Sequence, residues 1–377
     1  MMIVSRVEII PVHIPMTQPM SISYATFKTC DFVLTRVATN EGIVGVGECP
    51  PLPPLSRESQ ETIVPLLEKF IAPQILGEDP FDLERIWEKM DSAMPGYPFP
   101  KAALDIALYD IMGKTLGVPV HKLLGGAYRT RFSNVGLIGL GSTEEIRGLA
   151  QRYVADGYKA IRLKTGLGLN ADERNVRAVR ETVGEDVTLR LDANQAYIPP
   201  KAIKFVKAME KYDIELVEQP TPWYDFKGLA AVAKAVDTPI MPHESLYLLS
   251  DAIQLLDLEA MDVLGLKVYR PGGGLTSAKK LISLAELMDI PCLMHDDVEL
   301  GISLAAATHF IAANYRHLKY ANELSGYPAW ITDDVVKKTP RMEGGLVEVP
   351  EGPGLGVELD EEKLKKYAER VVVCQKE

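Results

Sequence analysis

Apolar and polar side chains alternate along the first fifty residues, which is the pattern of antiparallel strands with one buried face. Three such runs cover residues 3–14, 31–39 and 42–49. Asn40-Glu41-Gly42 lies between the last two runs and is typical of a hairpin turn. Prolines at four of the positions 50–54 then end the alternation and indicate a loop.

After this loop, the apolar positions recur at the spacing of helices. The spacing predicts helices at about 58–76, 80–90 and 101–116, with Asp79 as the N-cap of the second and Pro80 in its first turn. We therefore expect a separate α+β capping domain over residues 1–125. The C-terminal tail, residues 341–377, has the pattern of a strand, a turn and a short helix, and we expect it to pack against this domain.

From about residue 131 onward, short apolar runs alternate with amphipathic helical segments. Seven or eight such units predict an α/β fold, a closed barrel of parallel strands over residues 126–340. An open, doubly wound sheet is the alternative. No glycine-rich dinucleotide loop follows the first strand, which favours the barrel.

Composition narrows the classes of function. The net charge of −11 argues against nucleic acids and anionic membranes as general partners, and no apolar run is long enough to span a bilayer. The N-terminus lacks the pattern of an export signal, so we expect a cytoplasmic protein. Its cysteines form no CxxC pair, which suits reduced thiols. They are Cys30, Cys49, Cys292 and Cys374.

Charged side chains recur where the predicted barrel strands end, and successive members of the series are 23 to 28 residues apart. This spacing is about one strand–helix unit, so all of them should meet at one mouth of the barrel, where such folds carry their active sites. The series is Lys164, Asp192, Glu218, Glu244 and Lys267.

Three carboxylates on successive strands predict a site for a hard divalent cation, Mg²⁺ or alternatively Mn²⁺. Each carboxylate taken singly has a structural alternative. Asp192 could cap the next helix, Glu218 could pair with an arginine, and His243-Glu244 could form a solvated loop. Their matching positions on three successive units favour the metal site.

The two lysines stand on opposite sides of the carboxylates in strand order. An amine with a reference pKa of about 10.4 becomes a useful base only when burial or nearby cations lower that pKa. Arg162 lies two residues before Lys164 on the same strand face and would supply such a charge. These residues predict proton abstraction next to a carboxylate, with a metal stabilising the enediolate that results.

Over nearly its whole length the chain resembles the enolase superfamily, and within it the mandelate racemase/muconate lactonizing enzyme family. The resemblance rests on "ALDIALYDIMGKTLGVPVHKLLGG", "RLKTG", "LDANQAY", "VEQP" and "LKVYRPGGGLTSAKK". It implies a modified (β/α)₇β barrel of the TIM type, capped by an α+β domain whose loops at 16–27 and 48–57 close over the site. The resemblance also implies that Asp192, Glu218 and Glu244 hold Mg²⁺ and that Lys164 and Lys267 act as acid/base residues on opposite faces of the substrate.

The chain departs from the family pattern at three places. Arg162 replaces the first lysine of the Lys-x-Lys strand, although the base at the second position is retained. His243 precedes Glu244 where muconate-lactonizing relatives usually have Asp-Glu, so Glu244 is the expected ligand and His243 a neighbour of the metal or, alternatively, a ligand. The loop "YRPGGGL" is one residue longer than the common pattern.

The substrate is expected to be a small carboxylate. Asp296 and Asp297, after the seventh strand, could neutralise an ammonium or quaternary amine, as in members that act on proline betaines and related amino-acid derivatives. The alternative is that one aspartate caps the helix starting near Gly301 while Glu299 orients Lys267. The full set of expected substrate contacts is Arg162, Asn194, Asp296, Asp297, Glu299, Glu323 and Tyr24.

Three reaction outcomes fit the same residues. Two proton-transfer lysines favour a racemase or epimerase of an amino-acid derivative, such as an N-substituted amino acid, a proline betaine or a dipeptide. A muconate-type cycloisomerase or a syn-dehydratase would need only one lysine as base. A non-catalytic scaffold that binds a carboxylate is the alternative of a different class, and by analogy with other barrels we expect a homo-oligomer.

Overall fold

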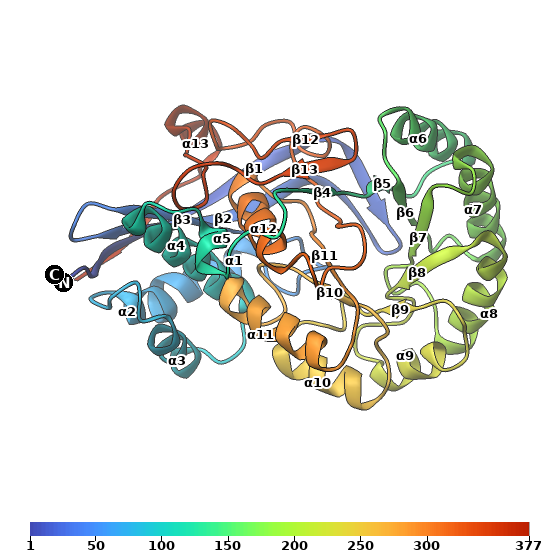
Figure 1. The fold of residues 1–377 in the computed structure, drawn as a ribbon, viewed down its shortest axis with the longest axis horizontal. Coiled ribbons are helices and arrows are strands. Elements are labelled where there is room, and N and C mark those ends of the chain that lie inside the picture. Colours follow the sequence, from blue (N-terminus) through green and yellow to red (C-terminus); the bar gives the residue numbers. More distant parts are fainter. Residues whose placement is uncertain (377) are drawn as a thin grey trace.

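A computed structural model describes residues 1–376. An antiparallel sheet with its helices packs against a ring of parallel strands that is surrounded by further helices (Figure 1). Within residues 1–376, no helix combines the length and the apolar character needed to cross a lipid bilayer. The predicted fold class, a barrel of the TIM type with an α+β cap, is confirmed by this arrangement.

The cap is built on a four-stranded antiparallel sheet in the order β14-β1-β2-β3. The predicted hairpin is present, because β2 and β3 pair in antiparallel register and Gly42 takes a φ of +80° in the turn between them. The tail returns to the N-terminus, with β14 lying beside β1. The strands are β1 (Val4–Ile22), β2 (Ala25–Thr39), β3 (Val44–Cys49) and β14 (Val372–Gln375).

Helices follow the sheet in the three regions where the pattern predicts them. The second begins later than expected, because Asp79 does not cap it: its carboxylate accepts a hydrogen bond from the Phe81 amide (3.0 Å), and the helix starts at Leu83. The helical elements of the cap are α1 (Gln60–Leu66), the π-helical turn η1 (Leu67–Ile71), α2 (Ala72–Ile75), α3 (Leu83–Ala93), α4 (Pro98–Leu116) and α5 (Val120–Leu123).

The barrel contains a five-stranded parallel sheet, β5 to β9, and a parallel pair, β10 and β11. The Asp262 amide bonds to the Ile240 carbonyl (3.0 Å) and links the two groups. The predicted eighth strand is present only as isolated bridges from residues 318–323 to β11 and to the chain before β5. The strands are β5 (Gly136–Ile138), β6 (Ala160–Lys164), β7 (Thr188–Asp192), β8 (Ile214–Glu218), β9 (Ile240–Met241), β10 (Leu264–Leu266) and β11 (Cys292–Met294).

Helices cover the outside of the barrel, and a small sheet and one helix connect it to the tail (Figure 1). The barrel helices are α6 (Thr143–Ala155), α7 (Leu169–Val183), α8 (Pro199–Met209) with the 3₁₀ turn η2 (Glu210–Tyr212), α9 (Phe226–Ala233), α10 (Leu249–Asp257), α11 (Gly274–Leu287) and α12 (Gly301–Asn314). The connecting elements are β4 (Arg131–Ser133), β12 (Met342–Glu343), β13 (Leu346–Glu348) and α13 (Glu361–Tyr367).

The N-terminus of α12 joins the cap to the barrel. Glu48, in β3, accepts hydrogen bonds from the amides of Leu300 (2.9 Å) and Ser303 (2.8 Å), and Asp334 accepts one from Gly301 (2.9 Å). These carboxylates satisfy amides that have no partner inside the helix. The alternative in which Asp296 or Asp297 caps this helix is therefore wrong.

Candidate active site

Strand register brings the first three predicted residues together. Lys164, Asp192 and Glu218 are the last residues of β6, β7 and β8, and they are direct partners across the parallel pairs. Glu244 follows β9 by three residues, and Lys267 follows β10 directly. All five are buried, so these charges meet in a region from which water is largely excluded.

Asn194 connects Lys164 to the predicted metal ligands. Lys164 donates from Nζ to Asp192 Oδ2 (2.5 Å) and to Asn194 Oδ1 (2.8 Å). The Asn194 amide donates to Asp192 Oδ1 (2.9 Å), and its side-chain Nδ2 donates to Glu244 Oε1 (3.1 Å). One asparagine thus links the amine to Asp192 at the end of β7 and to Glu244 in the loop after β9.

Glu244 lies among like charges. Burial, together with the nearby carboxylates of Asp192 and Glu218, raises the pKa of this carboxyl to about 7. Tyr24 donates from its hydroxyl to Glu244 Oε1 (3.4 Å), which brings the cap into contact with the barrel site. His243 and Glu244 are both buried, so the alternative of a solvated loop is wrong.

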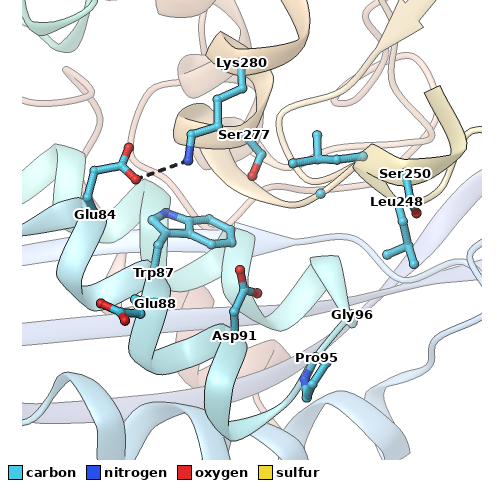
Figure 2. A pocket seen from close by; sticks show the side chains of 12 residues that line it. Glu84, Trp87, Glu88, Asp91, Pro95, Gly96, Leu248, Ser250, Ser277 and Lys280 are labelled. Atoms are coloured by element: carbon cyan, nitrogen blue, oxygen red, sulfur yellow. Dashed lines mark hydrogen bonds and ion pairs between the residues drawn. The ribbon is translucent and has the colours of Figure 1, made fainter. Parts of the chain in front are cut away.

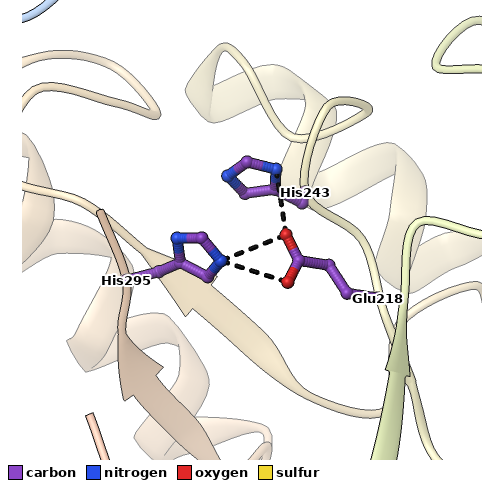
Figure 3. A group of neighbouring side chains, drawn as sticks. All are labelled: Glu218, His243 and His295. Carbon is purple, nitrogen blue, oxygen red and sulfur yellow. Dashed lines mark hydrogen bonds and ion pairs between the residues drawn. The ribbon is translucent and has the colours of Figure 1, made fainter. Parts of the chain in front are cut away.

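Glu218, His243 and His295 form the compact group shown in Figure 3. One potential ligand atom from each lies within 4.8 Å of the others. Glu218 Oε1 is 3.1 Å from His243 Nδ1 and 3.1 Å from His295 Nε2, yet it has no hydrogen-bond partner. Asp192 and Glu244 lie outside this compact group. Asn194 links these two carboxylates by hydrogen bonds, and His243 Nδ1 lies between Glu244 and Glu218.

The hydrogen bonds of the two imidazoles determine which nitrogen of each carries the proton. Arg270 Nη2 can only donate, so His243 Nε2 (2.8 Å away) accepts and His243 Nδ1–H points toward Glu244 Oε2 (3.3 Å). The Asp296 carbonyl can only accept, so His295 Nδ1 donates to it (2.6 Å) and His295 Nε2 keeps its lone pair, facing Arg162. Burial lowers the pKa of both histidines well below the usual value, which keeps them neutral.

A divalent cation fits these residues. Glu218 Oε1 is buried without a hydrogen-bond partner, and Glu244 is disfavoured as an anion beside Asp192 and Glu218. A positive charge among them would relieve both conditions. The donor set of carboxylate oxygens suits Mg²⁺, whereas the His243 nitrogen nearest to the group already carries a proton.

Lys267 is held by Asp297 on the other side of the site. Its Nζ donates to Asp297 Oδ1, and Arg270 Nη2 lies 3.9 Å from the same oxygen. Burial and the Arg270 charge lower the pKa of Lys267 to about 8 although Asp297 opposes this change. Burial would raise the pKa of Asp297, but Lys267 and Arg270 outweigh it and lower that pKa to about 2. Lys267 therefore changes charge near neutral pH.

Arg162 and Glu323 belong to a buried ion-pair network, and Arg162 also lines the cavity described below. Arg162 Nη1 donates to Glu218 Oε2 (3.1 Å) and to Glu323 Oε2 (2.6 Å), and Glu323 also accepts from Arg190 (2.8 Å). Glu218 thus pairs with an arginine through one oxygen, as the structural alternative predicted. Its other oxygen still faces the predicted metal site, so the two interpretations do not exclude each other. Glu323 is occupied by two guanidinium groups of the chain itself.

Asp296 and Glu299 have environments that differ from that of Asp297. Asp296 accepts from the Ser325 amide, and burial raises its pKa to about 7. Both oxygens of Glu299 are buried without a hydrogen-bond partner, and burial together with Asp296 raises the pKa of this carboxyl well above the usual range. Lys267 is held by Asp297, so the alternative in which Glu299 holds this lysine is wrong.

A small cavity of about 10 Å³ lies at this mouth of the barrel, between the strand ends and the cap. Lys164 lines it directly, whereas Lys267 approaches it through Asp297. A larger, more open hollow lies between α3 of the cap and the first turns of α10 and α11, crossed by the Glu84–Lys280 ion pair (Figure 2). None of the predicted site residues lines that hollow, so the smaller cavity is the candidate active site.

Two residues of the site were not anticipated from the sequence. His295 follows β11 directly, just as Lys267 follows β10, so the rule of strand ends would have selected it. Arg270 lies in the loop "YRPGGGL", and no sequence signal places its guanidinium between His243 and Asp297.

Known proteins resemble this chain over both halves. Residues 5–125 match the family model described as "Mandelate racemase / muconate lactonizing enzyme, N-terminal domain", and residues 145–363 match "Enolase C-terminal domain-like". The L-Ala-D/L-Glu epimerase of Bacillus subtilis is 30% identical over 355 residues, which are 93% of this chain and 96% of that protein. Muconate cycloisomerase 1 of Rhodococcus opacus is 31% identical over 365 residues, 96% of this chain and 97% of that protein.

A solved structure agrees with these matches. The dipeptide epimerase of Enterococcus faecalis, in complex with Mg and the dipeptide L-Leu-L-Tyr, superposes with a TM-score of 0.86 at 32% identity. The superposition covers 94% of this chain and 99% of that one.

Proposed function

The chain belongs to the mandelate racemase/muconate lactonizing enzyme family of the enolase superfamily, and we propose that it is an Mg²⁺-dependent racemase or epimerase of an amino-acid derivative. The observation that carries this proposal is the placement of Lys164 and Lys267 on opposite sides of the carboxylates at one mouth of the barrel. Named relatives in the family are isomerases, both epimerases and cycloisomerases.

Asp192, Glu218 and Glu244 are the proposed holders of Mg²⁺. The bound ion supplies positive charge beside the substrate carboxylate, where negative charge develops as the α-proton leaves. Asn194 and His243 support these ligands, since the Asn194 amide donates to Asp192 and both side chains donate to Glu244. Arg162 supports the remaining ligand, Glu218, by donating a hydrogen bond to its Oε2.

The two lysines exchange protons with the substrate α-carbon from opposite faces. Lys267 has a pKa of about 8, so it can accept a proton from the α-carbon in its neutral form or return one in its charged form. Lys164 rests against Asp192 and Asn194 and lines the cavity, where it can serve the other face. Racemisation needs both roles, and this is why two amines favour it.

The remaining predicted contacts are proposed as substrate-facing groups. Asp296 and Asp297 line the cavity, and Asp296 has one oxygen free of the Ser325 bond, so it is the better partner for a substrate ammonium. Tyr24 reaches the site from the cap through Glu244.

Hydrogen exchange tests the proposal. In D₂O with Mg²⁺, a substrate that enters the site should exchange its α-proton for deuterium before or along with inversion, which proton NMR detects. The probes are N-acetyl amino acids, L-Ala dipeptides and proline betaine. Absence of exchange from all of them, together with conversion of cis,cis-muconate to muconolactone, would instead establish the cycloisomerase, which is named among the relatives.

We further propose that the protein acts in the cytoplasm as a homo-oligomer and that Mn²⁺ can replace Mg²⁺. The free cysteines support a reducing compartment: Cys30, Cys49 and Cys292 are buried and unpaired within the described residues. Analytical ultracentrifugation tests the oligomer, and activity of the chelated enzyme with each ion tests the metal.

A further inference from the structure

The two cap segments above the cavity carry few charges. Residues 16–27 contain no Asp, Glu, Lys or Arg, and residues 48–57 contain only Glu48 and Arg57. The only charged partners that these two segments could offer to a substrate are therefore Glu48 and Arg57.

Both charged side chains interact with groups of the protein that lie outside the cavity. Glu48 is fully buried and accepts hydrogen bonds from the first amides of α12. Arg57 lies with its guanidinium 3.7 Å from the ring centre of Trp223 and 4.7 Å from that of Tyr247, and it donates to the Glu244 carbonyl. Neither side chain lines the cavity.

The polar side chains of the first segment do not line the cavity either. Ser21 bonds to Thr26 (2.9 Å), Ser23 donates to the Asn194 carbonyl (2.5 Å) and Tyr24 donates to Glu244. What remains on the cavity wall is apolar. The cap side consists of Met20, Ile22, Phe27, Leu52 and Leu55, and Leu137 of β5 extends it.

The opposite wall is polar and belongs to the barrel. It includes Lys164, His243 and Asp296, which lie at or beside the strand ends where the substrate carboxylate and α-carbon are placed by the proposed function. The cavity thus has a reactive polar floor and a closed apolar roof. A distal charge on the substrate would be buried against the roof without a partner, which is costly.

We propose that the side chain of the substrate faces the apolar roof and is small, neutral and apolar, and that the roof rejects substrates whose side chain is charged. This inference rests on the proposed function. It sets the chain apart from the epimerase relative named for L-Ala-D/L-Glu, whose substrate has a carboxylate in its side chain. It also disfavours the second carboxylate of muconate.

Matched probes test the proposal on the unmodified enzyme. Leucine and aspartate have side chains of similar size, and norleucine and lysine share a straight chain, so each pair differs mainly in charge. We expect α-proton exchange of the leucine and norleucine probes, as N-acetyl amino acids or as C-terminal residues of L-Ala dipeptides, to exceed that of their charged partners by at least about 100-fold in kcat/KM.

A charge placed on the roof provides the second test. Leu52→Lys should raise the relative rate of the aspartate probe at least about tenfold, because a buried carboxylate then finds a partner. Thr29→Lys adds the same charge at an exposed position beside the cap segment and should leave the preference unchanged. If Leu52→Lys does not fold, Leu55→Lys makes the same test from the neighbouring wall position.

The outcomes are distinguishable. Exchange of the charged probes within tenfold of their apolar partners would overturn the apolar-roof inference and leave the proposed function intact. Absence of exchange from every probe, with Mg²⁺ binding retained in calorimetry, would overturn the proposed function and the inference with it.

Discussion

Asp297 accepts a hydrogen bond from the Nζ of Lys267; both side chains are buried, and Asp297 lines the cavity whereas Lys267 does not. Arg270 stands on the other side of this pair and opposes the effect of Asp297 on the lysine. The protonation of one amine is therefore set by a balance between an anion and a cation that the chain itself provides.

Asp297→Asn should shift the pH dependence of one direction of the reaction. Where Lys267 removes the α-proton it must be neutral, so kcat/KM should rise with pH through about 8 in the unmodified enzyme. Asp297 raises the pKa of Lys267, so its loss should lower that pKa and move the rising limb to lower pH. Rate profiles for the two enantiomers check this, and an unmoved limb would show that Asp297 does not tune the lysine.

Lys164→Ala and Lys267→Ala should each slow racemisation by about 10²–10⁴-fold in kcat because a positioned proton-transfer group is missing. Each variant should still exchange the α-proton of one enantiomer, and the two variants should retain opposite ones. Proton NMR in D₂O of each separate enantiomer measures this. If both variants still exchange the α-proton of the same enantiomer, the two lysines act on the same face of the substrate.

Glu218→Gln should remove the stabilisation by Mg²⁺. An ion at 100 times its Kd stabilises the folded protein by about 2.7 kcal/mol, which appears as a rise in Tm. Glu218→Gln should lose this rise in Tm because it removes the carboxylate whose buried Oε1 has no hydrogen-bond partner within the protein. Glu215→Gln, on the same strand but paired with Arg190, is the control and should keep the rise. An equal Mg²⁺ shift in both variants would argue against Glu218 as a ligand.

Arg57→Ala should loosen the cap above the cavity. Loss of the guanidinium between Trp223 and Tyr247 should raise KM about tenfold and speed amide hydrogen exchange in residues 50–57, since a desolvated cation–π contact is worth about 2 kcal/mol. Arg129→Ala removes a similar contact, with Tyr315 at 4.9 Å, and serves as the control. Unchanged exchange in residues 50–57 would contradict the assigned role of Arg57.

Several features of the site could be predicted because they depend only on local pattern and topology. Lys164, Asp192 and Glu218 each end a short apolar run, and parallel strands in a barrel present those ends at one rim. His295 obeys the same rule, since it directly follows β11, and it stands next to two aspartates that carry the same kind of signal. Asp79 shows the limit of local pattern, since its carboxylate bonds to Phe81 and the helix begins after it.

The sequence by itself determined the order of strands and helices, the family and the set of charged residues that gather at the barrel mouth. These follow from periodicity and from residues at strand ends, which are properties of neighbours along the chain. Only the tertiary structure decided that Glu48 caps α12, whose first bonded amide lies 252 residues further along the chain. The same is true of the contacts of Arg57 with Trp223 and the Glu244 carbonyl, and of the hydrogen bond by which Asp297, and not Glu299, holds Lys267. Such contacts depend on how the cap and the loops pack together, and side chains remote in the chain carry no local signal of their eventual partner.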